Sequence, residues 1–147
     1  MTKYTPGKVL PNHEIVRMPV DVLVTAAVPH LFGGGDVDHI KAKLVVQGSN
    51  IPTTPDVEEL LHQKGILVIP DFVANAGGVI SSFAEWDGRS QEEMFKLVEQ
   101  RIRRNTKIML EHAKERRCSP RVAAMAIAQQ RVLEKCTFCK IDFPAKR

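Results

Sequence analysis

Long apolar runs are missing from this chain. No segment approaches the ~18 consecutive apolar residues that cross a membrane, and residues 1–20 have no apolar core of a secretion signal. We therefore expect no membrane partner. Cysteine is also scarce, and its odd count of three argues against a disulfide framework and favours a reducing cytoplasm.

Aromatic residues are few, with one tryptophan and one tyrosine, and the net charge of +4 is mild. The basic residues are mostly interleaved with acidic ones in helical patterns, and no binding motif accompanies them, so nucleic acid is not an expected partner. A hydrophobic fraction of 44% over 147 residues suits one globular unit with a real core.

Several motifs that carry chemistry are absent. Gly33–Gly35 is not followed by Gly-Lys-Ser/Thr, and no G-x-G-x-x-G turn occurs, so a flexible linker is favoured over a phosphate cradle. The histidines show no metal-ligand spacing, and Cys136-x-x-Cys139 lacks two further ligands, so no metal site is predicted. No general acid–base pair can be recognised either, and no catalytic residue is predicted.

What the chain does contain is an alternation of strands and helices. Short apolar runs at residues 20–27, 44–47 and 66–69 predict buried strands. Helices are predicted at 36–43, from Pro55 with Thr54 as cap, after Gly77, from a capping box at Ser90, and from Ser119 to about Lys135. The alternation predicts an α/β fold, with a three-stranded parallel sheet, flanking helices and C-terminal helices.

The same pattern predicts four regions. Residues 1–19 form a lead-in segment, residues 20–88 an α/β unit that the resemblance described below identifies as a partial dinucleotide-binding domain, residues 89–135 a C-terminal helical pair, and residues 136–147 a tail. Since that resemblance implies only one half of a doubly wound sheet, the strand at 20–27 would have an open edge and would expose Val22, Leu23 and Val24. Because unpaired strand edges favour association, we expect a homo-oligomer.

Polar and small residues follow the ends of all three strands. Ala26 and Ala27 end the first strand, Gly48 and Asn50 follow the second, and Asn75 follows the third. Parallel strands bring their carboxyl ends to one edge, where α/β proteins bind ligands, so we expect these residues to cluster there.

Five motifs in order resemble those of the glutamate/leucine/phenylalanine/valine dehydrogenase family, and glutamate dehydrogenases most closely. They are Asp21-Val-Leu-Val-Thr-Ala-Ala27, Ile40-Lys-Ala-Lys-Leu-Val-Val-Gln-Gly-Ser-Asn50, Pro52-Thr-Thr-Pro55, Ala74-Asn-Ala-Gly-Gly-Val79 and Ala123-Ala-Met-Ala-Ile-Ala128. The resemblance covers about residues 12–135 and implies the second half of a Rossmann-like NAD(P)-binding domain with its closing helices.

The resemblance also implies roles for single residues. Ala26, Ala27 and Gly48 would lie at the cofactor, which is NAD or NADP, Asn50 would reach the ribose region, and Asn75 would bind the nicotinamide carboxamide. Two further residues, Val79 and Ser82, would touch the amino-acid substrate. Asparagine suits an amide ligand because it offers both a donor and an acceptor.

A complete family member carries an N-terminal substrate domain and the G-x-G-x-x-G half of the cofactor domain, and neither is found here. The implied function is that of a C-terminal portion of an NAD(P)-dependent glutamate dehydrogenase, which oxidatively deaminates L-glutamate to 2-oxoglutarate and ammonia. Alone, the chain would bind cofactor weakly or not at all and would be inactive, unless a partner chain supplied the missing half.

The alternative is a non-catalytic nucleotide-binding or subunit-interaction module. The sequence leaves open NAD against NADP, and glutamate against another amino acid.

Overall fold

The computed structural model describes residue 7 and residues 9–136. Three strands, β1 (Val22–Thr25), β2 (Leu44–Gln47) and β3 (Leu67–Ile69), form a parallel sheet in the order β1-β2-β3. Leu23 lies beside Val45, and Val45 beside Val68, so successive strands are in register. The α/β fold with a three-stranded parallel sheet is therefore confirmed.

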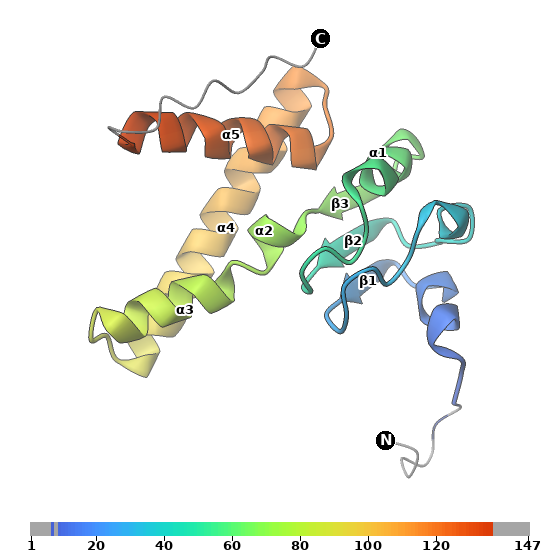
Figure 1. Ribbon diagram of the computed structural model, residues 1–147, viewed down its shortest axis with the longest axis horizontal. Helices are drawn as coiled ribbons and strands as arrows, with labels where there is room; N and C mark the ends of the chain where they lie inside the picture. The colour runs from blue at the N-terminus through green and yellow to red at the C-terminus, as the bar shows by residue number, and fades with distance from the viewer. Residues whose placement is uncertain (1–6, 8, 137–147) are drawn as a thin grey trace.

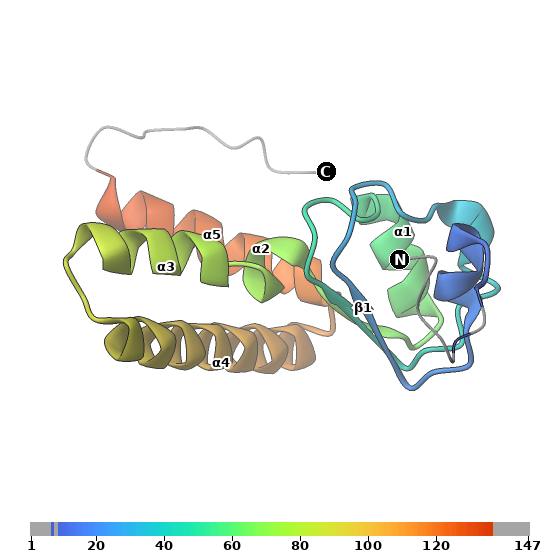
Figure 2. The same cartoon turned by 90° about the horizontal axis from the view of Figure 1, so that it is seen from below.

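Seven helices lie within the described residues. Two are short 3₁₀ helices, η1 (Asn12–Arg17) and η2 (Gly34–Asp36). The α-helices are α1 (Pro55–Gln63), α2 (Asp71–Ala74), α3 (Gly77–Trp86), α4 (Gln91–Arg116) and α5 (Pro120–Lys135). The sheet, α1 and the 3₁₀ helices lie at one end of the molecule, while α3, α4 and α5 extend to the other end, with α2 between them (Figures 1 and 2).

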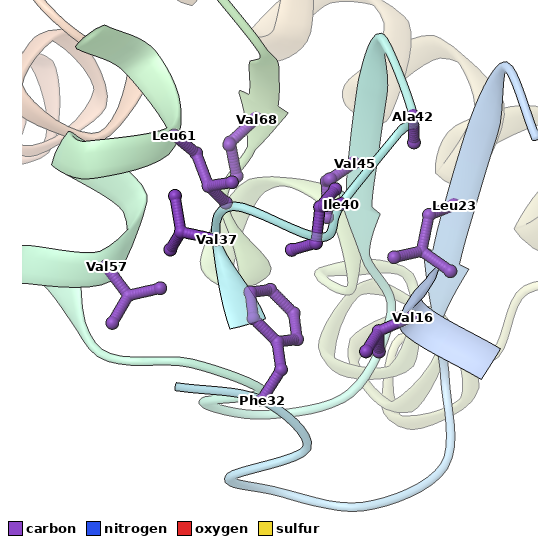
Figure 3. Close-up of a cluster of buried hydrophobic side chains, with 10 residues drawn as sticks. All are labelled: Val16, Leu23, Phe32, Val37, Ile40, Ala42, Val45, Val57, Leu61 and Val68. Atoms are coloured by element: carbon purple, nitrogen blue, oxygen red, sulfur yellow. The ribbon is translucent and has the colours of Figure 1, made fainter. Parts of the chain in front are cut away.

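One face of the sheet carries the main core. Leu23, Val45 and Val68 point from adjacent strands to this face, and α1 covers it with Val57 and Leu61. Figure 3 shows how the other buried members of the cluster gather around them, namely Val16, Phe32, Val37, Ile40 and Ala42. Leu61 and Val45 are 0% exposed, so the packing between α1 and the sheet is complete at its centre.

The opposite face of the sheet is covered unevenly. Ile69 of β3 packs with residues of α2, α4 and α5, and Val46 of β2 packs at the border of that cluster. Val22 and Val24 of β1 remain 49% and 59% exposed. The expected exposure of Val22 and Val24 is thus found, but the prediction for Leu23 was wrong. Successive strand residues point to opposite faces, and Leu23 points into the core at 6% exposure.

The segment before β2 differs from expectation. The predicted helix at 36–43 does not form, and a single 3₁₀ turn, η2, precedes an irregular stretch. Val37 and Ile40 are nevertheless buried, because a turn followed by extended chain can place residues three apart on the same core. The one-turn helix α2 lies between β3 and the turn that leads to α3.

Two further expectations concern the C-terminal part. The apolar run at residues 122–128 predicts a helix that is buried on nearly all sides, and this prediction was wrong: Ala123 and Ala124 are buried, but Val122 and Met125 are exposed. Cys136 follows α5, and Cys139 lies outside the described residues, so the structure does not describe this pair. No helix in the described part of the chain is long and apolar enough to span a membrane.

Candidate functional site

An open pocket of about 590 Å³ lies at the carboxyl edge of the sheet. Three chain segments form it: the end of β1, the turn after β2, and the junction of α2 with α3. The lining residues are all uncharged, and they are Ala26, Ala27, Pro29, Gly48, Ser49, Asn50, Asn75, Gly78 and Val79.

Two asparagine side chains meet in this pocket. The side-chain amide of Asn75 donates a hydrogen bond to Oδ1 of Asn50 over 2.6 Å. Asn50 is exposed and Asn75 half-buried. Since each amide has both donor and acceptor groups, the pair retains hydrogen-bonding capacity on each side for a bound molecule.

Gly48 allows the floor of the pocket to form. A Cβ at this position would lie 3.2 Å from Cβ of Ala26 and 3.2 Å from the carbonyl oxygen of Thr25. The N–H of Ser49 donates to that same carbonyl over 2.7 Å, and the Ser49 hydroxyl donates to the carbonyl of Val28 over 3.3 Å. These contacts require the turn after β2 to approach the end of β1 closely, which a side chain at 48 would hinder.

The start of α3 closes the pocket on its other side. A Cβ at Gly77 would lie 3.3 Å from Cγ1 of Val98, so this glycine lets α3 pack closely on α4, whereas Gly78 faces open space. Val79 is 77% exposed beside Gly78. The first N–H groups of a helix lack intrahelical partners, so this end of α3 favours electronegative ligand atoms.

The structure brings six of the seven proposed contact residues to one pocket: Ala26, Ala27, Gly48, Asn50, Asn75 and Val79. Ser82 is not among the lining residues, and its hydroxyl donates to the carbonyl of Gly78 over 3.1 Å. The roles of these residues toward a cofactor or substrate stay predictions. Sequence reasoning did not propose Pro29, Ser49 or Gly78, although Ser49 and Gly78 each adjoin a residue that it did propose and Pro29 lies two positions after Ala27.

A buried ion-pair network beneath the pocket was also missed. Asp71 is 8% exposed, and its carboxylate accepts hydrogen bonds from the backbone N–H of Ile51 at 2.9 Å and from the Arg121 guanidinium at 2.8 Å. Burial alone would raise the pKa of Asp71, but these hydrogen bonds outweigh it and hold that pKa below its usual range. Nothing in the sequence links Asp71 to Arg121, because 50 positions separate them.

The pocket suits binding rather than proton transfer. Its lining offers amide groups, small side chains and backbone groups, and it contains no carboxylate, histidine or lysine. No cluster of metal-ligating side chains occurs in the part of the chain that the structure describes. The small side chains leave room beside the two amides, which can bind a ligand that carries its own donor and acceptor groups.

A parallel sheet that carries such a pocket at its carboxyl edge defines this chain as a Rossmann-like α/β portion. The sequence profile of the Glutamate/Leucine/Phenylalanine/Valine dehydrogenase family matches residues 1–138. The chain belongs to this family of oxidoreductases.

Individual relatives support the same assignment. The chain is 40% identical to the glutamate dehydrogenase of Aeropyrum pernix over 142 residues, covering 90% of this chain and 34% of that protein. It is 37% identical to the NADP-specific glutamate dehydrogenase of Saccharolobus shibatae, covering 90% and 33%. The chain therefore spans about a third of the length of these relatives.

Solved structures agree with the sequence comparisons. The hetero-hexameric glutamate dehydrogenase of Thermus thermophilus superposes with a TM-score of 0.79 at 29% identity, covering 90% of this chain and 33% of that one. The L-tryptophan dehydrogenase of Nostoc punctiforme gives a TM-score of 0.75 at 28% identity, covering 83% and 37%. The fold is thus shared with dehydrogenases of more than one amino acid.

Proposed function

We propose that this chain is the carboxyl-terminal portion of an NAD(P)-dependent glutamate dehydrogenase, and that its pocket holds the nicotinamide end of the cofactor. The observation that carries this proposal is the Asn50–Asn75 pair, 2.6 Å apart in an open pocket at the carboxyl edge of the sheet. The 40% identity to a glutamate dehydrogenase supports glutamate as the substrate.

Each lining segment has a task in this proposal. Ala26 and Ala27 are small enough to let a flat ring approach the end of β1, Asn50 binds the ribose region, and Asn75 holds the carboxamide. Val79, with Ser82 one turn further along α3, faces the amino acid where it meets the ring. The bound cofactor supplies the hydride acceptor, and the protein binds and orients it.

Either NAD or NADP fits this arrangement. The two cofactors share the nicotinamide half that the pocket would contact, so the lining residues do not distinguish them. Relatives from Saccharolobus shibatae and Pyrobaculum calidifontis are named for NADP. Because its cysteine count is low and odd, we expect the chain to act in the reducing cytoplasm.

The chain alone should not turn over glutamate. Oxidative deamination to 2-oxoglutarate and ammonia needs a group that moves protons at the substrate, and the pocket lining is uncharged. We expect no steady NAD(P)H formation when glutamate and cofactor are added to protein free of host dehydrogenase. A sustained rate that Asn75→Ala abolishes would contradict this expectation.

Cofactor binding is testable without catalysis. The sequence contains four asparagines, at positions 12, 50, 75 and 105, so selective ¹⁵N labelling of asparagine gives one side-chain amide signal set for each. On titration with nicotinamide mononucleotide, the signals of Asn50 and Asn75 should move, with a dissociation constant of about 1 mM, or ~4 kcal/mol. Asn75→Ala should weaken binding, whereas the control Asn105→Ala on α4 should not. No movement at Asn50 and Asn75, or equal movement at all four sites, would refute the proposal.

The alternative function, an interaction module, also has an observation in its favour. A groove of about 540 Å³ runs along β1, lined by β1 and the chain that follows it and by apolar residues of the preceding segment, namely Leu10, Pro11, Ile15 and Met18. β1 pairs with β2 only, among the described residues, so its other edge is available for a second chain. That chain would be a second copy of this protein, or one that carries the half of the cofactor domain not found here.

A further inference from the structure

Ile51 occupies an unusual backbone conformation beside the pocket. Its φ is +45°, in the left-handed region that β-branched residues rarely adopt. Two hydrogen bonds hold its peptide groups there: its N–H donates to Asp71 Oδ2 over 2.9 Å, and its carbonyl accepts from the N–H of His30 over 2.8 Å. Because Ile51 directly follows Asn50, this conformation sets the direction in which Asn50 leaves the turn.

Asp71 is itself held by a guanidinium. Arg121, near the start of α5, donates to Asp71 Oδ1 over 2.8 Å and to both carboxylate oxygens of Glu58 over 2.7 Å each. Its guanidinium also lies over the Phe72 ring, 5.2 Å from the centroid. Glu58 is 3% exposed on α1, so one planar group ties together α1, α2 and α5 beneath the pocket.

The backbone of the same aspartate contacts the segment of the second asparagine. Asp71 begins α2, and its carbonyl accepts from the N–H of Asn75 over 2.8 Å at the other end of that turn. Its own N–H donates to Oε1 of Gln47 over 3.0 Å, which fixes the start of α2 to the end of β2. Asp71 therefore anchors both segments whose side chains meet in the pocket.

We propose that Arg121 is a positioning residue for the Asn50–Asn75 pair, and that it acts through Asp71 and the strained peptide of Ile51. A purely stabilising role explains less of the geometry. Buried ion pairs often add little net stability over apolar residues of similar size, whereas a bidentate fork fixes direction. The link to cofactor binding rests on the proposed function, but the link from Arg121 to the asparagines does not.

The experiment uses spectra of the ¹⁵N-asparagine chain without ligand. Arg121→Lys keeps the positive charge but cannot reproduce the fork to Glu58 and Asp71. Arg131→Lys is the matched control, because Arg131 lies on the same helix and donates to Oδ1 of Asn105 over 3.1 Å. We expect Arg121→Lys to shift the side-chain amides of Asn50 and Asn75 and to leave that of Asn105 in place. Arg131→Lys should do the reverse.

A second variant covers the case in which Arg121→Lys does not fold. Glu58→Gln removes one of the two carboxylates that orient Arg121 and leaves Asp71 intact, so it should shift the same two amides by a smaller amount. Far-ultraviolet circular dichroism and the melting temperature identify a variant that has unfolded. Folded variants whose Asn50 and Asn75 signals stay at wild-type positions would overturn the proposal, and so would equal shifts of all four asparagines.

Titration of the same samples separates this proposal from the proposed function. If nicotinamide mononucleotide moves the wild-type signals, Arg121→Lys should weaken its binding severalfold and Arg131→Lys should leave it unchanged; equal binding to Arg121→Lys would overturn the positioning role. If the nucleotide moves nothing in the wild type while Arg121→Lys still shifts Asn50 and Asn75, the positioning role stands and the cofactor role fails.

Discussion

At the scale of single residues, the strain at Ile51 is directly testable. Ile51 is 51% exposed, so truncating its side chain removes little buried apolar surface. Ile51→Gly and Ile51→Ala therefore lose nearly the same contacts. In an ordinary loop alanine is favoured over glycine by ~0.4–1 kcal/mol. At a φ of +45° a Cβ costs ~1–2 kcal/mol, so the order should reverse, with Ile51→Gly more stable than Ile51→Ala by ~1 kcal/mol. Urea unfolding measures both variants, and the opposite ranking would contradict the left-handed conformation.

Asp71 gives a prediction about pH. Its pKa is lowered in the folded protein, so the stability that it contributes is present above the unfolded pKa of about 3.9 and is lost as the pH falls through the folded value. Asp71→Asn should cost ~2 kcal/mol at pH 7, because it weakens hydrogen bonds to a charged group. The difference from wild type should shrink below pH 4. A difference that stays constant from pH 7 to pH 3, in chemical unfolding, would contradict this.

The part of the candidate site that could be predicted from the sequence consists of residues that follow the predicted strands. Ala26, Asn50 and Asn75 each follow an apolar run, and the parallel sheet then brings them together. The supporting residues were not predictable in this way. Arg121 reaches Asp71 and Glu58 only because α5 packs against the sheet, which depends on the whole fold.

At the scale of elements, helix starts offer a matched pair of sites. The Ser90 hydroxyl accepts a hydrogen bond from the N–H of Glu93, as the capping box predicts for α4. Thr54 occupies the same position before α1 but makes no such side-chain bond. Ser90→Ala should therefore cost ~1 kcal/mol and Thr54→Ala much less. Thermal unfolding measures the difference, and we expect the melting temperature of Ser90→Ala to fall by ~2–4 °C. An equal fall in the melting temperature of both variants would show that the side-chain hydrogen bond of Ser90 contributes nothing to stability.

Element boundaries followed from sequence where the signals were local and strong. β2 begins and ends as predicted, because its apolar run is bounded by Gly48, and α1 begins at Pro55. The helix predicted at 36–43 failed because the spacing of Val37 and Ile40 suits a turn with extended chain as well as a helix. The division at residues 88 and 89 stays a prediction, although α3 packs along α4 (Figure 2).

At the scale of the whole molecule, coverage of the sheet is asymmetric. Ile69 of β3 is buried against α2, α4 and α5, while Val22 and Val24 leave one face of β1 uncovered. Within the described residues β1, like β3, pairs only with β2 and so has an unpaired edge. Residues 10–18 do not pair with β1; they place Val16 in the core and form one wall of the groove beside it. Natural edge strands are usually blunted by lysine or proline, and β1 contains neither.

We therefore expect a homo-oligomer, most simply a two-fold dimer that pairs or covers β1. Val22 is 49% exposed on the uncovered face, so Val22→Lys should raise the dissociation constant at least tenfold, or ~1.4 kcal/mol, by placing two like charges at the interface. Val132→Lys on α5, where Val132 is 44% exposed, is the matched control. Sedimentation equilibrium at micromolar concentration distinguishes the outcomes. A monomeric wild type would exclude the dimer. If Val132→Lys dissociates the dimer and Val22→Lys does not, the interface lies at α5 and not at β1.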